Sequence, residues 1–362
     1  MKYFDCFTSA TAAGSGSQNW FSPEDPKKPL TARQYFKLSR PVRGEMSILY
    51  SNTIDSTFSD GAHSRAGFVP GAWRIHSLRA GLVEAVSMDK APEPATFYTL
   101  RFMGKTDREV NPGELFCCDP FPLEAPKGAY LCLEMTFSGA RIPCHTESLL
   151  PAFRLGEDGK FGHCTDAPFP SMLGAKRGAE TRIGMLGDSI TQGIGTQPNS
   201  YANFAALVQE ALGPDAAVWN LGLGFGRASD AAQEGMWLYK AKQNDIVCVC
   251  YGVNDLFKTR DAAGIKNSLA CIVRRLKADG VRVLIQTVPP FDYAPEYREM
   301  WMDVNRFIKN VLSREADALL DVVPILCKSP DQPYASAYGP HPNAQGNALW
   351  AKALVETLRK MI

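Results

Sequence analysis

A serine in the second half of the chain has the surroundings of a nucleophile. It lies in Gly187-Asp188-Ser189, directly after the apolar run 182–187 and ahead of a helical pattern. A serine at such a strand-to-helix turn exposes its hydroxyl beside the N–H groups of the helix N-terminus, which suits nucleophilic attack and a developing oxyanion. The same residue types also form ordinary helix N-caps, so the three positions alone are a weak signal.

Three other segments supply the groups that a serine nucleophile needs. Asn220 opens a glycine-rich loop, in which Gly224 and Gly226 let the backbone approach a ligand closely. Asn254 follows another apolar run and offers its amide as an oxyanion donor. His341 is the only histidine after residue 163 and therefore the only imidazole base in this half. Together these residues favour acyl transfer.

The elements that must position these groups alternate between strand and helix patterns. Near-continuous apolar runs are typical of strands buried on both faces of a parallel sheet, and helical crossovers between them predict a three-layer α/β domain. The runs are 182–187, 216–220, 245–252, 281–288 and 318–326. Each chemical segment follows one of these strands, so all are expected at the carboxyl edge of the sheet, where α/β folds bind ligands.

The first 150 residues follow a different pattern. Short strand segments such as 46–51, 96–103 and 129–138 are separated by turn residues, which predicts an all-β sandwich or jelly-roll over 1–150. The glycine- and proline-rich stretch 151–180 predicts a linker packed along the surface. The α/β catalytic domain is then expected over 181–362.

Composition excludes several classes of function. The chain has 362 residues, with 39 basic and 38 acidic side chains, and this balance argues against nucleic-acid binding and polybasic membrane binding. No apolar run predicts a signal peptide or a membrane span. Ten cysteines are too few for a disulfide scaffold of this length, which favours a reducing, cytoplasmic location. The cysteines near His145 lack the usual zinc-site spacing, so no metal is predicted.

The four segments resemble, in the same order, the four sequence blocks of the SGNH (GDSL-type) hydrolases over roughly 180–362. The resemblance implies a flavodoxin-like five-stranded sheet and an ester hydrolase that needs no metal or organic cofactor. It implies Ser189 as nucleophile, His341 as general base, and an oxyanion hole formed by the Ser189 N–H, a glycine N–H and the Asn254 side chain. Asp188 and Asp255 are expected to support their loops. The order of a β-sandwich followed by a hydrolase domain resembles that of two-domain carbohydrate esterases, which remove acetyl groups from sugars. The resemblance therefore implies an O-acetylated sugar or oligosaccharide as substrate.

Two positions depart from the family pattern. Phe225 lies where the second block usually has its glycine, so either Gly224 or Gly226 could supply the oxyanion N–H. Tyr338 lies three residues before His341, where the family commonly has aspartate, and tyrosine stays neutral near pH 7. This departure predicts a Ser–His dyad whose imidazole is held by a backbone carbonyl in 336–339.

Two alternative functions remain open at this point. One is a lipase or thioesterase that acts on a different acyl group. The other is a non-catalytic carbohydrate-binding protein whose hydrolase domain has decayed, which Tyr338 could suggest and which the presence of Ser189, Asn254 and His341 argues against. The sugar, the linkage position and the oligomeric state are not encoded in any pattern that we recognise.

Overall fold

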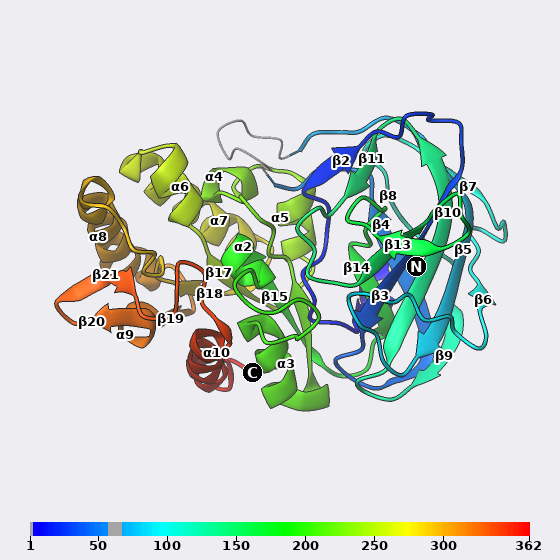
Figure 1. The fold of residues 1–362 in the computed structure, drawn as a ribbon. Helices are drawn as coiled ribbons and strands as arrows, with labels where there is room; N and C mark the ends of the chain where they lie inside the picture. The colour runs from blue at the N-terminus through cyan, green and yellow to red at the C-terminus, as the bar shows by residue number, and fades with distance from the viewer. Residues whose placement is uncertain (1–2, 57–66) are drawn as a thin grey trace. The chain divides into compact units, whose positions relative to one another are not determined.

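The computed structural model describes residues 3–56 and 67–362, which form two compact units (Figure 1). Among the described residues, the first unit holds 3–54 and 67–180, and the second holds 55–56 and 181–362. The second unit therefore includes two residues that come from the middle of the β-rich half of the sequence.

The first unit consists of antiparallel strands in two main sheets (Figure 1), as predicted for this half. One sheet has the order β1-β14-β4-β8 with β9 also on β4, and the other has the order β13-β12-β3-β10-β5-β6 with β7 on β5. The rings of Trp73 and Phe116, one from each sheet, pack against each other with their centroids 6.3 Å apart. The elements of this unit are α1 (Tyr3–Cys6), β1 (Phe7–Ser9), β2 (Asn19–Phe21), β3 (Leu30–Lys37), β4 (Val42–Ser51), β5 (Trp73–Val83), β6 (Tyr98–Thr99), β7 (Arg108–Val110), β8 (Leu115–Cys117), β9 (Phe121–Ala125), β10 (Tyr130–Gly139), β11 (Ile142–Cys144), β12 (Ala152–Leu155), β13 (Phe161–His163) and β14 (Met172–Lys176).

The stretch 151–180 is not a linker. β12 pairs with β3 and β13, while β14 pairs with β1 and β4, so the stretch supplies strands to both sheets. The glycines and prolines suggested irregular chain, but Phe153, Met172 and Leu173 are buried between them. Burial of these apolar side chains outweighs the turn residues that separate them.

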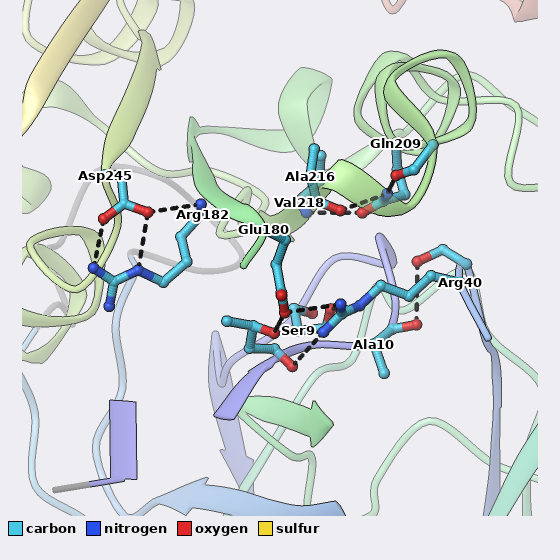
Figure 2. A network of polar contacts seen from close by, with 12 residues as sticks. Ser9, Ala10, Arg40, Glu180, Arg182, Gln209, Ala216, Val218 and Asp245 are labelled. Carbon is cyan, nitrogen blue, oxygen red and sulfur yellow. Dashed lines mark hydrogen bonds and ion pairs between the residues drawn. The ribbon is translucent and has the colours of Figure 1, made fainter. Parts of the chain in front are cut away.

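A buried polar network holds the end of this unit. Arg40 donates from Nη1 to a Glu180 carboxylate oxygen at 2.9 Å and from Nε to the Ser9 carbonyl at 3.0 Å (Figure 2). Thr8 also donates to Glu180. Glu180 is the last residue of the first unit, so these contacts fix the chain directly before it enters the α/β unit.

The second unit contains a parallel five-stranded sheet in the order β16-β15-β17-β18-β19. Numbered within this unit the order is 2-1-3-4-5, the flavodoxin-like arrangement, as predicted. Helices α3 and α10 pack together on one face, and α4, α6, α7 and α8 form a group on the other (Figure 1). The elements are β15 (Thr181–Gly187), α2 (Ser189–Gln192), α3 (Phe204–Leu212), η1 (Gly213–Asp215), β16 (Ala216–Asn220), α4 (Ala228–Ala231), α5 (Met236–Ala241), β17 (Ile246–Cys250), α6 (Val253–Lys258), α7 (Ala262–Ala278), β18 (Arg282–Gln286), α8 (Pro295–Asn310), η2 (Leu312–Arg314), β19 (Ala318–Leu320), α9 (Val323–Leu326), β20 (Cys327–Ser329), β21 (Gln332–Ser336) and α10 (Ala344–Leu358).

The fifth strand is shorter than the sequence suggests. β19 ends at Leu320, and the apolar residues after it form the short helix α9, which has Pro324 in its first turn. Proline lacks an N–H but fits the first turn of a helix, so it favours a helix start within this apolar run. The hairpin of β20 and β21 then leads to His341. The expected final helix is confirmed, with the Asn343 side chain accepting the Gly346 N–H at 3.0 Å.

Polar side chains inside the second unit tie its strands together (Figure 2). Gln209 on α3 accepts the Val218 N–H at 2.8 Å and donates to the Ala216 carbonyl at 3.0 Å. Asp245, directly before β17, accepts the backbone N–H of Arg182 at 2.8 Å and also pairs with its guanidinium. Gln209 thus holds α3 against β16, and Asp245 joins the start of β17 to β15. The far ends of these strands carry the candidate site.

The cysteines and helices allow two further observations. All ten cysteines, each of which the structure describes, are free thiols. Across residues 3–56 and 67–362, no helix has both the length and the apolar character needed to cross a bilayer.

Candidate active site

Ser189 is the first residue of helix α2 and is not the helix cap. Asp188 takes that role, since its Oδ1 accepts the Ile190 N–H at 2.9 Å. Gly187 allows β15 to lie close to β17 at this point, because a Cβ on it would lie 2.7 Å from the Cys250 carbonyl oxygen. The simple N-cap interpretation of this motif therefore applies to Asp188, and the half-buried Ser189 hydroxyl is left for another partner.

That partner is His341, which is 152 residues further along the chain. Its Nε2 lies 2.9 Å from the Ser189 Oγ. Burial lowers the pKa of His341 below its ordinary value of 6.5, because a desolvated imidazole is less easily charged. The ring is therefore neutral at pH 7 and can accept the serine proton.

The expected acceptor for the other ring nitrogen is missing from the described part of the chain. No carbonyl of 336–339 accepts a hydrogen bond from His341 Nδ1, so that expectation is wrong in this structure. No Asp or Glu among the described residues forms an ion pair with His341 either. Tyr338 packs on the first turn of α10, where a Cβ on Gly346 would lie 2.8 Å from the Tyr338 Cβ. The His341 ring instead contacts Phe291, with ring centroids 5.2 Å apart and planes at 81°.

The glycine-rich loop lies against the helix that carries Ser189. Asn220 donates to the Thr191 carbonyl at 3.0 Å and accepts the Gly222 N–H at 2.9 Å. Gly222 allows this approach, because a Cβ on it would lie 2.2 Å from the backbone nitrogen of Gln192. The loop and the nucleophile helix therefore form one packed unit.

The two glycines considered for the oxyanion hole differ in what their N–H groups contact. The Gly224 N–H donates to the Gln192 side-chain oxygen at 2.7 Å, and the Gly226 N–H donates to the Leu223 carbonyl at 3.1 Å. A side-chain acceptor can rotate away from Gly224, whereas the Gly226 bond belongs to a main-chain turn. Phe225 between them has φ +59°, in the left-handed region that glycine usually occupies. The residue at the usual glycine position thus keeps a glycine-like backbone.

Asn254 and Asp255 lie at the start of α6, beside the same loop. Asn254 donates from Nδ2 to the Gly226 carbonyl at 3.0 Å, and its second amide N–H remains available to a ligand. Asp255 accepts the Ala228 N–H at 3.0 Å, and burial raises its pKa to about 6. Burial also raises the pKa of Asp188 to about 7. Neither carboxylate is hydrogen-bonded to Ser189 or His341 within the described residues.

Sequence reasoning missed two residues that contact the candidate oxyanion loop. Gln192 lies in the motif around Ser189, so its position on α2 could have drawn attention to it. Ser56 donates to the Gly224 carbonyl at 3.1 Å, although it comes from the β-rich half of the sequence. Next to it, Asp55 forms an ion pair with Lys240, and both side chains are 1% exposed. Nothing in the local pattern around residue 55 indicates this contact.

No residues of the described chain suggest a metal centre. Over 3–56 and 67–362, no group of three or more His, Cys, Asp or Glu side chains is placed to hold an ion. The chemistry that the site supports is attack by the Ser189 hydroxyl, with His341 as proton acceptor.

Residues 185–349 match the model of the GDSL-like Lipase/Acylhydrolase family. The α/β unit is a GDSL-type acylhydrolase domain. The match to this family supports a carboxylic ester hydrolase activity. No curated protein matches the chain.

Solved structures similar to the acylhydrolase domain include three bacterial proteins. A lipolytic protein of the G-D-S-L family from Veillonella parvula has 16% identity and a TM-score of 0.40, covering 50% of this chain and 99% of its own. A psychrotrophic esterase from Pseudoalteromonas has 18% identity and a TM-score of 0.41, covering 50% and 98%. An acetylxylan esterase from Geobacillus stearothermophilus has 17% identity and a TM-score of 0.38, covering 50% and 94%.

Proposed function

We propose that this hydrolase acts through a Ser189–His341 dyad. The observation that carries the proposal is the 2.9 Å contact between Ser189 Oγ and His341 Nε2 at the carboxyl edge of the sheet. Ser189 Oγ attacks the acyl carbon of the ester while His341 takes its proton. The tetrahedral intermediate collapses, His341 returns the proton to the leaving alcohol, and an acyl-enzyme remains. Water then attacks the acyl-enzyme, with His341 again as base, and releases the acid.

The developing oxyanion needs hydrogen-bond donors. Ser189 supplies its backbone N–H, Gly224 supplies a second, and the Asn254 amide supplies the third. The Gly224 N–H becomes available when the Gln192 side chain rotates away from it. We choose Gly224 over Gly226 because only its present acceptor is a side chain.

Asn254→Ala is expected to lower kcat by about 10²–10³, as removal of one oxyanion donor does in other hydrolases. KM is expected to change little, because the lost bond strengthens only as the oxyanion forms. Steady-state kinetics on an acetyl ester measure both constants. Ser56→Ala is the matched control, since it removes a hydrogen bond to the same loop without removing a donor to the oxyanion. An unchanged kcat in Asn254→Ala would exclude this side chain from the oxyanion hole.

The pH dependence follows from the burial of His341. The catalytic base must be neutral, so kcat/KM should fall as pH drops through the pKa of His341. Burial places that pKa below 6.5, and the midpoint of the acid limb is therefore expected below pH 6.5. Initial rates from pH 4.5 to 8 on one acetyl ester give the midpoint. A midpoint above pH 6.5 would contradict the assignment of a desolvated, uncharged base.

Tyr338→Phe is expected to leave kcat within about threefold of wild type, a change below 1 kcal/mol in the barrier. The physical reason is that Tyr338 packs on Gly346 of α10 and its phenol forms no hydrogen bond to His341 among the described residues. The same kinetic assay tests it, with circular dichroism as the check on folding. Loss of activity in a folded Tyr338→Phe protein would make the phenol part of the mechanism.

For the substrate, we propose an O-acetylated sugar or oligosaccharide. Support comes from the order of the units, because an antiparallel β unit ahead of this hydrolase domain resembles the two-domain carbohydrate esterases. Acetate release from a panel of acetylated mono- and oligosaccharides tests it. Activity on 4-nitrophenyl esters of increasing chain length separates it from a lipase or thioesterase, since a sharp preference for acetyl is expected. A preference for long chains would favour the lipase alternative.

A fluorophosphonate tests the non-catalytic alternative. The reagent phosphonylates an activated serine, so intact-mass and peptide spectra should show one adduct, on Ser189. A protein that stays unlabelled would be a binding module with a decayed site. We place the enzyme in the cytoplasm, in keeping with its ten free thiols. Cell fractionation would overturn this location by recovering the enzyme outside the cytoplasm.

A further inference from the structure

The His341 ring is directed at Ser189 without the support that a catalytic imidazole usually has. In hydrolases of this kind a carboxylate accepts the Nδ1–H bond and thereby fixes the orientation of the ring. Among the residues described, no acidic side chain or backbone carbonyl does this for His341. The ring still lies with Nε2 2.9 Å from Ser189 Oγ, so its orientation depends on this hydrogen bond and on the side chains that pack against the ring.

Phe291 is one such side chain. Its ring meets the His341 ring in a T-shaped arrangement, with centroids 5.2 Å apart and planes at 81°. T-shaped pairs are a preferred geometry of aromatic rings, because the positive edge of one ring faces the negative face of the other. Rotation of the imidazole away from Ser189 would disturb this pairing.

Phe291 belongs to a cluster of aromatic rings. It lies 5.6 Å from the Phe257 ring and 6.3 Å from the Tyr293 ring. Tyr293 is fully buried, donates its hydroxyl to the Pro289 carbonyl at 3.1 Å, and packs on Trp301 of α8. The ring that contacts His341 therefore has a packed wall of aromatic side chains next to it.

The segment before Phe291 is also anchored through its backbone. Asn305 on α8 accepts the Val288 N–H at 2.7 Å and donates to the Val288 carbonyl at 2.9 Å. The Trp301 indole donates to the same carbonyl at 3.0 Å. Because both backbone groups of Val288 are hydrogen-bonded to side chains of α8, the loop that leads to Phe291 is fixed at its start.

The backbone of His341 is held from another direction. Gly195, in the turn after α2, lies so close that a Cβ on it would be 2.7 Å from the His341 carbonyl oxygen. Gly195 also has φ +100°, a backbone angle that residues with a side chain rarely adopt. The backbone of His341 is thus confined beside the nucleophile turn, and the ring orientation is left to its own contacts.

We propose that Phe291 is a positioning residue, which replaces the missing carboxylate by packing against the His341 imidazole. The inference rests on the dyad proposed above. A hydrocarbon ring restricts rotation but adds no negative charge, so it orients the base without stabilising the imidazolium as a carboxylate would. The effect should therefore appear in kcat, where alignment with the reacting atoms matters, and not in substrate binding.

The test compares variants at Phe291 with one further away in the same cluster. Phe291→Leu keeps an apolar side chain but removes the flat ring. We expect its kcat to fall about 10–100-fold, because the base is misaligned, and its KM to stay within about twofold of the wild-type value. Phe291→Tyr keeps the ring and should retain kcat within about threefold. Tyr297→Leu is the control, because Tyr297 packs on Phe257 and has no ring contact with His341 within the described chain. It should behave as wild type.

A second measurement does not depend on activity. Nuclear magnetic resonance of the imidazole C–H protons, assigned with His341→Ala, should show a ring-current shift for His341 that Phe291→Tyr retains and Phe291→Leu loses. An unchanged kcat in folded Phe291→Leu, or His341 resonances that do not respond to it, would overturn the inference. If Phe291→Leu fails to fold, the kcat of Phe291→Tyr and the His341 ring-current shift in the wild-type spectrum test the inference instead. Full activity of Ser189→Ala would instead overturn the dyad itself, so the two failures can be told apart.

Discussion

Ser189→Ala is expected to lower kcat for acetate release by about 10⁶, the loss seen when the nucleophile of a serine hydrolase is removed. The hydroxyl oxygen forms the bond to the acyl carbon, and it is the group that lies 2.9 Å from His341 Nε2. Stability should change little. The N-cap of α2 is Asp188, so the substitution leaves the capping hydrogen bond intact.

The measurement is single-substrate kinetics of purified wild type and variant, with thermal unfolding as the check on structure. Thr191→Val is a useful companion, because Thr191 lies in the same short helix and its hydroxyl is not part of the proposed chemistry. It should retain most of the activity that Ser189→Ala loses. Near-normal acetate release by a folded Ser189→Ala protein would remove Ser189 from the mechanism.

Lys240→Met is expected to lower the free energy of unfolding of the acylhydrolase domain by about 3–5 kcal/mol, the usual cost of removing one partner of a buried ion pair. Lys240 and Asp55 are each 1% exposed and form such a pair within the domain. Methionine matches the lysine stem in length, so little cavity is created. The loss comes from removing the buried ammonium group and its charge interaction with the Asp55 carboxylate.

Urea unfolding followed by tryptophan fluorescence measures this loss, because four of the six tryptophans lie in the acylhydrolase domain. The double variant Asp55→Leu with Lys240→Met should recover most of the lost stability, since an apolar pair can replace a buried ion pair at little cost. Lys242→Met is the matched control, because its ammonium group is partly exposed and pairs at the surface. A Lys240→Met protein as stable as this control would show that the ion pair contributes nothing.

Much of the acylhydrolase domain follows from its sequence. Apolar runs located the five strands, and the chemical residues at their ends indicated which edge of the sheet forms the site. Two segments of the chain differ from the sequence prediction. The run 318–326 predicts one strand, but a helix begins at Val323 within it, with Pro324 in its first turn. The glycines and prolines of 151–180 predict a linker, although the stretch contains the buried strands 152–155 and 172–176. Local patterns are ambiguous where turn residues and short apolar segments alternate.

By itself, the sequence determined the residue types of the site and their order, because periodicity and motif spacing are local properties of a chain. Only the tertiary structure decided which groups surround them. The Ser189–His341 contact spans 152 residues, and the Asp55–Lys240 pair spans 185. Whether the base has a carboxylate, a carbonyl or the Phe291 ring beside it depends on which side chains pack there. Contacts of this kind form only when distant segments are buried together, so no local pattern records them.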